Sequence, residues 1–246
     1  SASADLQDEL TGALVGLAHA CMNNPKTEQT DRIIIEGLFT TITNVNFNDE
    51  TLREMIARVR EEKAKVAPGC TTCISPCGNT NDYDMKRMWE ADDFFYRALF
   101  AVGEDFEMGD LLPLVLETGK VNLTCMEMLD RANTETFGTP VPTEVPLMVE
   151  KGPFIVITGH DLYDLKLLLE QTKDKGINVY THGEMLPAHA YPELKKYPHL
   201  KGNFGTAWQN QQKEFDHLPA PILYTTNCLM QPKSSYADRV FTTEAV

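Results

Sequence analysis

The sequence predicts an α/β protein in which a helical N-terminal bundle precedes a domain with a mostly parallel sheet. Three apolar runs of five residues, at 154–158, 177–181 and 222–226, carry the second half of this prediction. Each is rich in β-branched or aromatic side chains and is bracketed by Pro or Gly, as expected of strands in a sheet covered on both faces. Apolar stripes at helical spacing carry the first half of the prediction.

The stripes predict several helices within the first 150 residues. One stripe begins behind Asp5, and a second lies in a highly charged stretch that ends near Pro68. Further apolar helical patterns cover roughly 85–102 and 111–129. Stripes of this kind indicate helices that pack into a bundle. The first two consist of Leu6, Leu10, Leu14, Leu17, Leu52, Met55, Ile56 and Val59.

A proline-rich linker separates the predicted helices from the first predicted strand. Pro140, Pro142 and Pro146 fall within seven residues, and a helix cannot continue through them. We therefore predict a helical domain over 1–150 and an α/β domain over 151–246. Within the second domain, leucines at helical spacing follow Asp161, which occupies an N-cap position, so a helix is expected over 161–173. Strand, helix and strand together predict a βαβ unit.

Composition excludes some partner classes. The formal net charge of -14 would repel both nucleic-acid phosphates and an anionic membrane, so neither is expected as a partner. No run reaches the length of a membrane-spanning helix and no signal peptide is recognisable, which predicts a cytoplasmic location. Six cysteines in 246 residues are too few for a disulfide scaffold, and three of them cluster.

Each apolar run stops at residues that can bind a metal. His160 follows the first run, His182 and Glu184 follow the second, and Cys228 follows the third. Ligands of open α/β sheets bind at the carboxyl ends of the strands, so these side chains are expected to converge on one crevice. Imidazole, carboxylate and thiolate together indicate a transition metal.

Other interpretations of these residues remain open. A lone His after a strand is commonly a hydrogen-bonded structural residue. Cys228 could also be the nucleophile of a Cys–His hydrolase, with His160 or His182 as the base and Glu184 orienting the imidazole. No phosphate-binding or dinucleotide-binding glycine motif occurs, so a nucleotide is not expected.

Two further motifs have alternative interpretations. Cys70, Cys73 and Cys77 form a C-x2-C-x3-C run in a loop rich in Pro and Gly. These thiols could hold an iron–sulfur cluster or zinc, with Cys125 as a distant fourth ligand, or could be structural or oxidisable thiols. Residues 208–212, Trp-Gln-Asn-Gln-Gln, are rich in amides that could bond a neighbouring loop or a partner, or could be a solvated helix start.

Several motifs closely resemble those of the hybrid-cluster protein family, also called prismane proteins or hydroxylamine reductases. They occupy residues 38–47, 77–84, 158–162, 178–189, 208–212 and 226–228, so the resemblance covers nearly the whole chain. It implies a prismane-like fold, in which the α/β domain is Rossmann-like. It also implies an iron–sulfur oxidoreductase that reduces hydroxylamine to ammonia and nitric oxide to nitrous oxide.

The resemblance implies cofactors and partners as well. The family's hybrid iron–sulfur–oxygen cluster would take His160, Glu184 and Cys228 as metal ligands, and His182 is a candidate proton donor. Electrons would come through a second cluster, 4Fe-4S or 2Fe-2S, from an electron-donor redox protein. A homo-oligomer is possible, because an exposed sheet edge favours association.

The chain also departs from the family pattern. The cysteines that hold the second cluster would lie before Ser1, and the remaining hybrid-cluster ligands would lie beyond Val246. The match jumps near residues 91–94, and the family's clusters do not use the run from Cys70 to Cys77. We therefore expect an α/β domain cut short after its third recognised strand. The alternative function is that of a non-catalytic apo fragment.

Overall fold

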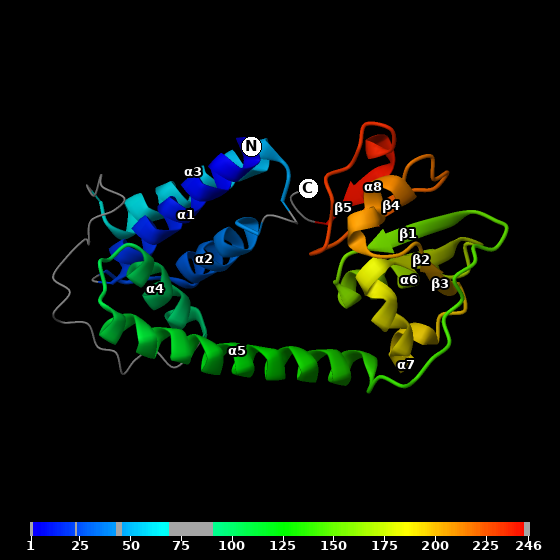
Figure 1. The fold of residues 1–246 in the computed structure, drawn as a ribbon, viewed down its shortest axis with the longest axis horizontal. Coiled ribbons are helices and arrows are strands. Elements are labelled where there is room, and N and C mark those ends of the chain that lie inside the picture. Colours follow the sequence, from blue (N-terminus) through cyan, green and yellow to red (C-terminus); the bar gives the residue numbers. More distant parts are fainter. Residues whose placement is uncertain (1, 23, 43–45, 69–90, 244–246) are drawn as a thin grey trace. The chain divides into compact units, whose positions relative to one another are not determined.

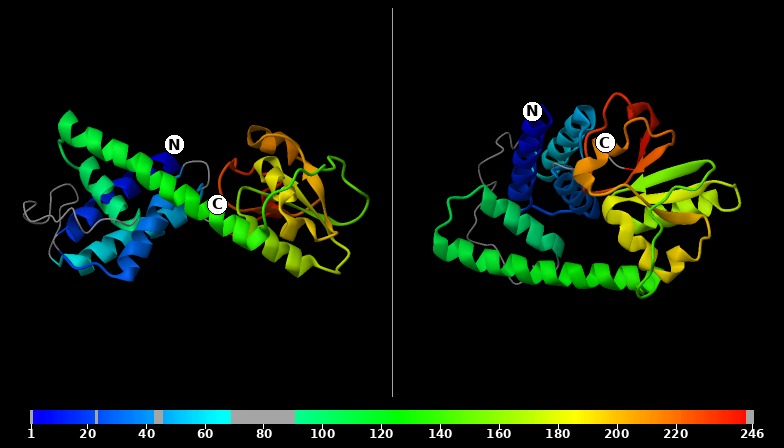
Figure 2. Two further views of the ribbon diagram at one scale, coloured as in Figure 1. Left: turned by 90° about the horizontal axis from the view of Figure 1, so that it is seen from below. Right: turned by 45° about the vertical axis from the view of Figure 1, so that its right-hand side comes forward.

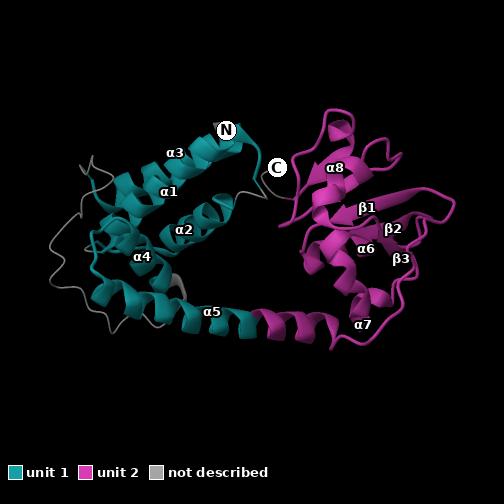
Figure 3. Cartoon of the chain, viewed as in Figure 1, with its two compact units in different colours: residues 1–128 teal, residues 129–246 magenta. Residues whose placement is uncertain are grey.

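The computed structural model describes residues 2–22, 24–42, 46–68 and 91–243. Their chain divides into two compact units, residues 1–128 and residues 129–246, which are described separately below (Figure 1 and Figure 3). The division falls inside a helix. The predicted domains, 1–150 and 151–246, place their boundary further along the chain and stay a prediction.

Unit 1 is helical, and α2 and α3 begin where polar side chains bond the first free backbone N–H groups. Thr27 and Thr30 form a capping box at the start of α2, and the Asn48 side chain accepts from Glu50 N and Thr51 N at the start of α3. Helices α1, α2 and α3 run side by side (Figure 1 and Figure 2). The helices are α1 Ala2–Cys21, α2 Glu28–Thr40, α3 Asp49–Val66, α4 Ala91–Val102 and α5 Met108–Phe137, which continues into unit 2.

The core of unit 1 contains both predicted stripes. Leu10, Leu14 and Leu17 of α1 are fully buried, and Leu6 packs against them from a half-buried position. From α3 come Leu52, Met55, Ile56 and Val59, all buried. Cys21 packs against the same cluster. The helical periodicity of the sequence therefore identified the core of these helices.

Helix α5 does not match the expectation of a buried bundle stripe. It is a helix of 30 residues, whereas the apolar pattern suggested only 111–129. Several of its apolar side chains, including Leu112, Leu116 and Leu123, are more than half exposed, although Phe137 at its end is buried. Periodicity predicts which side chains share a face, but it does not say whether another element covers that face.

Unit 2 contains a parallel five-stranded sheet in the order β3-β2-β1-β4-β5. The predicted strands and the predicted helix are present, and Asp161 caps the helix by accepting from Asp164 N. The elements are β1 Phe154–Thr158, α6 Leu162–Thr172, β2 Asn178–His182, η3 Gly183–Ala190, α7 Pro192–Lys195, β3 Leu200–Phe204, η4 Trp208–Asn210, α8 Gln211–Glu214, β4 Ile222–Tyr224, η5 Ala237–Arg239 and β5 Val240–Thr242.

Strand alternation gives the sheet two buried faces. On one face Ile157 and Val179 pack with Leu165 and Leu169 of α6. Side chains of the neighbouring positions point to the opposite face, where Phe215 lies against the rings of Tyr224 and His182. Helices α6 and α8 accordingly lie on opposite sides of the sheet (Figure 1).

Two strands were not predicted: β3, which lies between the second and third recognised strands, and β5, which adds one strand after the third. The sequence of β3 does not predict a strand, because it contains Lys201, Gly202 and Asn203, which have low strand propensity. Glycine is needed in this strand, since a Cβ at Gly202 would lie 2.1 Å from the Pro146 carbonyl oxygen. β5 has only three residues and forms one edge of the sheet. Among the described helices, none is both long and apolar enough to span a membrane.

Candidate metal centre

The three predicted ligands lie together at the carboxyl ends of their strands. β1 is hydrogen bonded to β2 on one side and to β4 on the other, so the three strand ends are adjacent. Thr158 pairs with His182 in the register of β1 and β2. His160 and Glu184 each stand two residues beyond that pair and therefore emerge side by side. Cys228 comes from the turn after β4.

The strand order explains why these ends form a site. The chain proceeds from β1 outward through β2 to β3, and then continues with β4 and β5 on the opposite side of β1. The order therefore reverses between β1 and β4, which is where open α/β sheets bind their ligands. His160 and Cys228 follow the two strands that flank this switch point.

The side chains contact one another directly. His160 Nε2 lies 3.0 Å from Glu184 Oε2, and Cys228 Sγ donates to the same oxygen at 3.2 Å. One nitrogen, one carboxylate oxygen and one sulfur of the three residues all lie within 4.8 Å of one another. Elsewhere in the described part of the chain, no other group of three or more His, Cys, Asp or Glu residues has ligand atoms this close together.

Gly159 allows the end of β1 to approach the segment after β4. Its φ is +109°, and a Cβ there would lie 2.2 Å from Thr225 Oγ1 and 2.7 Å from the Thr226 carbonyl oxygen. The approach is held by Thr225, whose N and Oγ1 both donate to the Thr158 carbonyl oxygen, at 3.0 and 2.9 Å. The glycine therefore brings His160 close to the Cys228 turn.

The turn that carries Cys228 has an unusual backbone. Asn227 and Cys228 have φ values of +63° and +54°, in the left-handed region that non-glycine residues seldom adopt. Each such residue costs on the order of 1 kcal/mol and persists only where its surroundings hold it. The strain coincides with the candidate ligand.

The environment of Cys228 disfavours its thiolate. Burial raises the pKa of the Cys228 thiol to about 11, and the hydrogen bond to Glu184 and the charge of that carboxylate contribute to the rise. A hydrolase nucleophile needs the opposite, a nearby base or cation that lowers the thiol pKa. Since Cys228 Sγ donates to Glu184 and not to an imidazole, the structure disfavours the Cys–His hydrolase.

The donor set fits a metal ion or a metal cluster. Two ligands on one metal, at bond lengths of about 2.0–2.3 Å, lie roughly 3–4 Å apart, close to the separations found here. Glu184 and His160 keep 47 % and 38 % of their side-chain surface exposed, so a metal can reach them from solvent. An imidazole, a carboxylate and a sulfur suit iron, which accepts both soft and hard ligands.

His182 lies near this centre but does not contribute to it. It is fully buried, with its ring 4.5 Å from that of Phe215. Its Nε2 lies 2.8 Å from Glu214 Oε2, and its Nδ1 lies 3.2 Å from Thr158 Oγ1. Burial lowers the pKa of His182, although the hydrogen bond to Glu214 opposes this effect. A buried neutral ring with both nitrogens bonded is a structural residue, which makes it a poor proton donor for substrate.

The sequence also offered other cysteines as candidate ligands. Cys70, Cys73 and Cys77 lie outside the described residues. Cys125 lies in α5 and is a free thiol, like Cys21 and Cys228. No signal in the sequence pointed to Glu214 as the partner of His182.

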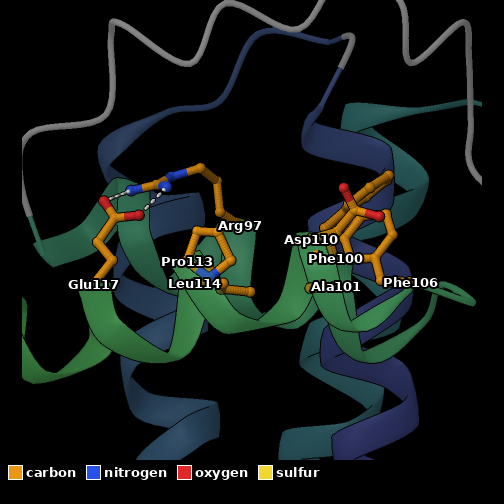
Figure 4. Close-up of a pocket in the computed structure, with 9 residues that line it drawn as sticks. Arg97, Phe100, Ala101, Phe106, Asp110, Pro113, Leu114 and Glu117 are labelled. Carbon is orange, nitrogen blue, oxygen red and sulfur yellow. Dashed lines mark hydrogen bonds and ion pairs between the residues drawn. The ribbon is translucent and has the colours of Figure 1, made fainter.

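Unit 1 has a cavity of about 360 Å³ between α4 and α5 (Figure 4). Arg97 and Glu117 occupy one end and are joined by two hydrogen bonds of 2.7 and 2.5 Å. Phe106 and Asp110 lie at the other end (Figure 4). The Glu117 carboxylate is already bonded to the guanidinium and most of the lining is apolar. The cavity therefore offers no convergent reactive groups comparable with those at the strand ends.

Curated relatives of the chain carry the name hydroxylamine reductase. The protein of Thermodesulfovibrio yellowstonii is 40 % identical over 304 residues, which cover 99 % of this chain and 56 % of the relative. That of Syntrophobacter fumaroxidans is 41 % identical over 302 residues, again covering 99 % and 56 %. The protein of Moorella thermoacetica is 57 % identical over 155 residues, 62 % of this chain and 36 % of the relative.

The chain spans about half the length of the first two relatives. Their alignments also exceed its 246 residues, so these relatives contain residues with no counterpart here. The family model described as Prismane/CO dehydrogenase family matches residues 85–246, which include all three candidate ligands. The motifs, the fold and these matches agree, and the chain belongs to the Prismane/CO dehydrogenase family.

Proposed function

We propose that this chain is part of an iron–sulfur oxidoreductase and that His160, Glu184 and Cys228 are ligands of its hybrid iron–sulfur–oxygen cluster. The observation that carries the proposal is the convergence of three different ligand types within 4.8 Å at a topological switch point. Family membership supports iron as the metal. When bound, the cluster would supply one-electron redox chemistry to a small substrate.

The chain's own residues have distinct tasks in this proposal. Cys228 supplies the sulfur, which must lose its proton before it binds a metal. Glu184 Oε2 accepts the thiol hydrogen bond at 3.2 Å, and since both groups must be ionised as ligands, this proton would leave to solvent when the metal binds. His160 and Glu184 supply the harder donors, whose partial exposure leaves a path for a small substrate. Such a mixed donor set would suit a cluster that takes both soft and hard ligands.

The substrates and partners belong to the same proposal. The relatives' name points to hydroxylamine as the substrate, reduced to ammonia, and reduction of nitric oxide to nitrous oxide is the second proposed activity. Electrons would come from a donor protein through a second cluster, 4Fe-4S or 2Fe-2S, with ligands outside these 246 residues. Because the chain spans 56 % of the relatives' length, a non-catalytic fragment without a complete cluster is the alternative.

The test is iron and acid-labile sulfide per chain in anaerobically purified protein, together with its intact mass. His160→Ala, Glu184→Ala and Cys228→Ala are each expected to lower the iron content and to alter the visible absorption of the cluster. Cys125→Ala is the matched control, since Cys125 is a free thiol in α5. Unchanged iron in all three ligand variants would refute the ligand set. A wild-type protein without iron would favour the apo fragment.

A further inference from the structure

Gln211 belongs to the amide-rich segment 208–212 and is buried beneath the turn that carries Cys228. Its side chain is fully buried, at the start of α8. The segment had two interpretations from sequence, a bond to a neighbouring loop or a solvated helix start. For Gln211 the bond to a neighbouring loop is confirmed, and this loop is the one that follows β4.

The Gln211 amide brackets the turn on both sides of Leu229. Its Nε2 donates to the Cys228 carbonyl oxygen at 2.8 Å, and its Oε1 accepts from Met230 N at 2.9 Å. These two bonds satisfy the Cys228 carbonyl and the Met230 N–H in the way that the backbone of a neighbouring strand would. The Leu229 side chain between them is buried, with 1 % of its surface exposed. The turn is therefore held at three successive residues.

The second N–H of the amide continues into a buried chain of hydrogen bonds. Gln211 Nε2 also donates to Thr158 Oγ1 at 3.2 Å, and the Thr158 hydroxyl lies 3.2 Å from His182 Nδ1. His182 Nε2 bonds Glu214, which accepts from Thr206 N as well. When His182 is neutral, every donor in this series of hydrogen bonds has an acceptor. The orientation of the Gln211 amide is therefore determined by its partners.

We propose that Gln211 is a positioning residue for Cys228. Its amide holds the left-handed backbone at Asn227 and Cys228, and that backbone directs the thiol toward Glu184. Without these two hydrogen bonds of the Gln211 amide, here called the clamp, the two strained residues can relax. The sulfur is then no longer held beside the other candidate ligands. The metal-related part of this inference rests on the proposed function, whereas the geometric part concerns the metal-free chain alone.

Site-specific alkylation of the metal-free protein tests the geometric part. Iodoacetamide is applied under native conditions, and modification at each cysteine is followed by peptide mass spectrometry. In Gln211→Met, which keeps the side-chain volume but removes the amide, alkylation of Cys228 is expected to accelerate at least about fivefold, because hydrogen bonds of ordinary strength are lost. Gln211→Glu keeps the acceptor for Met230 N but loses the donor to Cys228, and it should also accelerate the reaction.

Gln212→Met is the matched control. The Gln212 amide donates to the Gln231 carbonyl oxygen at 2.7 Å, so it bonds the same loop beyond the clamp. Alkylation of Cys228 in this variant should equal that of the wild type. Cys21 and Cys125 serve as internal controls, since faster alkylation at all three thiols would indicate general unfolding and would overturn the proposal. Equal rates at Cys228 in both Gln211 variants and the wild type would also overturn it.

Iron loading separates this inference from the proposed function. After anaerobic reconstitution with iron and sulfide, Gln211→Met should retain less iron than Gln212→Met, with an altered electron paramagnetic resonance signal. A wild type that takes up no iron refutes the proposed function and leaves the alkylation result to decide the role of Gln211. Iron and spectrum equal to those of Gln212→Met would overturn a role of Gln211 in metal binding.

Discussion

Gly159→Ala is expected to destabilise unit 2 by more than the backbone strain of an alanine at positive φ, because the new Cβ would also overlap neighbouring atoms. An alanine at φ +109° costs about 1–3 kcal/mol in backbone strain. Its Cβ would also lie 2.2 Å from Thr225 Oγ1, 2.7 Å from the Thr226 carbonyl oxygen and 2.9 Å from Thr226 N. Two of these atoms belong to the backbone and cannot rotate away, which adds roughly 1–3 kcal/mol of overpacking. The expected loss is therefore about 2–6 kcal/mol.

Gly152→Ala separates the two contributions. Gly152 has φ +136°, but the nearest atom to its Cβ would be Asn178 Nδ2 at 4.0 Å. This variant carries the backbone strain without the overlap. Urea unfolding is followed through Trp208 fluorescence in a Trp89→Phe background, since the chain has two tryptophans. With a slope of about 2 kcal/mol per molar urea, a difference of 2 kcal/mol between the variants shifts the midpoint by about 1 M.

A double variant identifies the atom responsible. Thr225→Ala removes the hydroxyl that would lie 2.2 Å from the new Cβ, together with its hydrogen bond to the Thr158 carbonyl oxygen. Gly159→Ala should therefore cost less stability in a Thr225→Ala background than in the wild type, because part of the steric overlap is gone. The backbone contacts to Thr226 remain, so recovery should be incomplete. If Gly159→Ala loses no more stability than Gly152→Ala, the overlap of the new Cβ with Thr225 and Thr226 adds no measurable cost. The reasoning from the close approach of β1 to the Cys228 turn is then refuted.

Three further predictions concern the core, a helix and pH. Leu165→Ala should lower the free energy of unfolding in urea by about 2–5 kcal/mol, because Leu165 is fully buried under the sheet. Leu167 is 37 % exposed, so Leu167→Ala should cost less than about 1 kcal/mol. Equal losses would contradict the packing of α6. Gly12→Ala should stabilise α1 by about 0.5–1 kcal/mol in thermal unfolding followed by circular dichroism, since its Cβ meets no atom within 4 Å, and a loss of stability would disprove this. Burial lowers the pKa of His182, although the hydrogen bond to Glu214 opposes this effect. As the pH decreases below about 6.5, the unfolded chain therefore binds a proton at this histidine before the folded protein does. The urea midpoint should fall over this pH range. The fall should be smaller in His182→Gln, and equal slopes in the two proteins would exclude this histidine as a cause.

Much of the candidate site could be predicted because it depends on local signals. Each strand is a short apolar run, and a residue that follows a parallel strand must emerge at the carboxyl edge of the sheet. This rule places His160, Glu184 and Cys228 at one edge without any knowledge of contacts. The cap at Asp161 is equally local, because its side chain bonds a backbone N–H three residues away.

The buried shell around the site could not be predicted in the same way. His182 has the same strand-end position as the candidate ligands, yet it is buried and bonded to Glu214, 32 residues further along the chain. Gln211 and Gln212 are neighbours with the same side chain, but only Gln211 is fully buried. Which amide reaches the Cys228 turn depends on the packing of α8 against the sheet, and no periodicity within segment 208–212 encodes it.

The sequence alone determined the helical stripes, the strands β1, β2 and β4, the cap of α6 and the edge of the sheet at which three ligand types emerge. Each of these follows from the order of apolar, polar and turn-forming residues along the chain. Only the tertiary structure decided that β4 lies beside β1, that β3 and β5 extend the sheet, and that Gln211 holds the Cys228 turn. These features depend on close packing between segments distant in sequence, where an ångström of separation determines which atoms can bond.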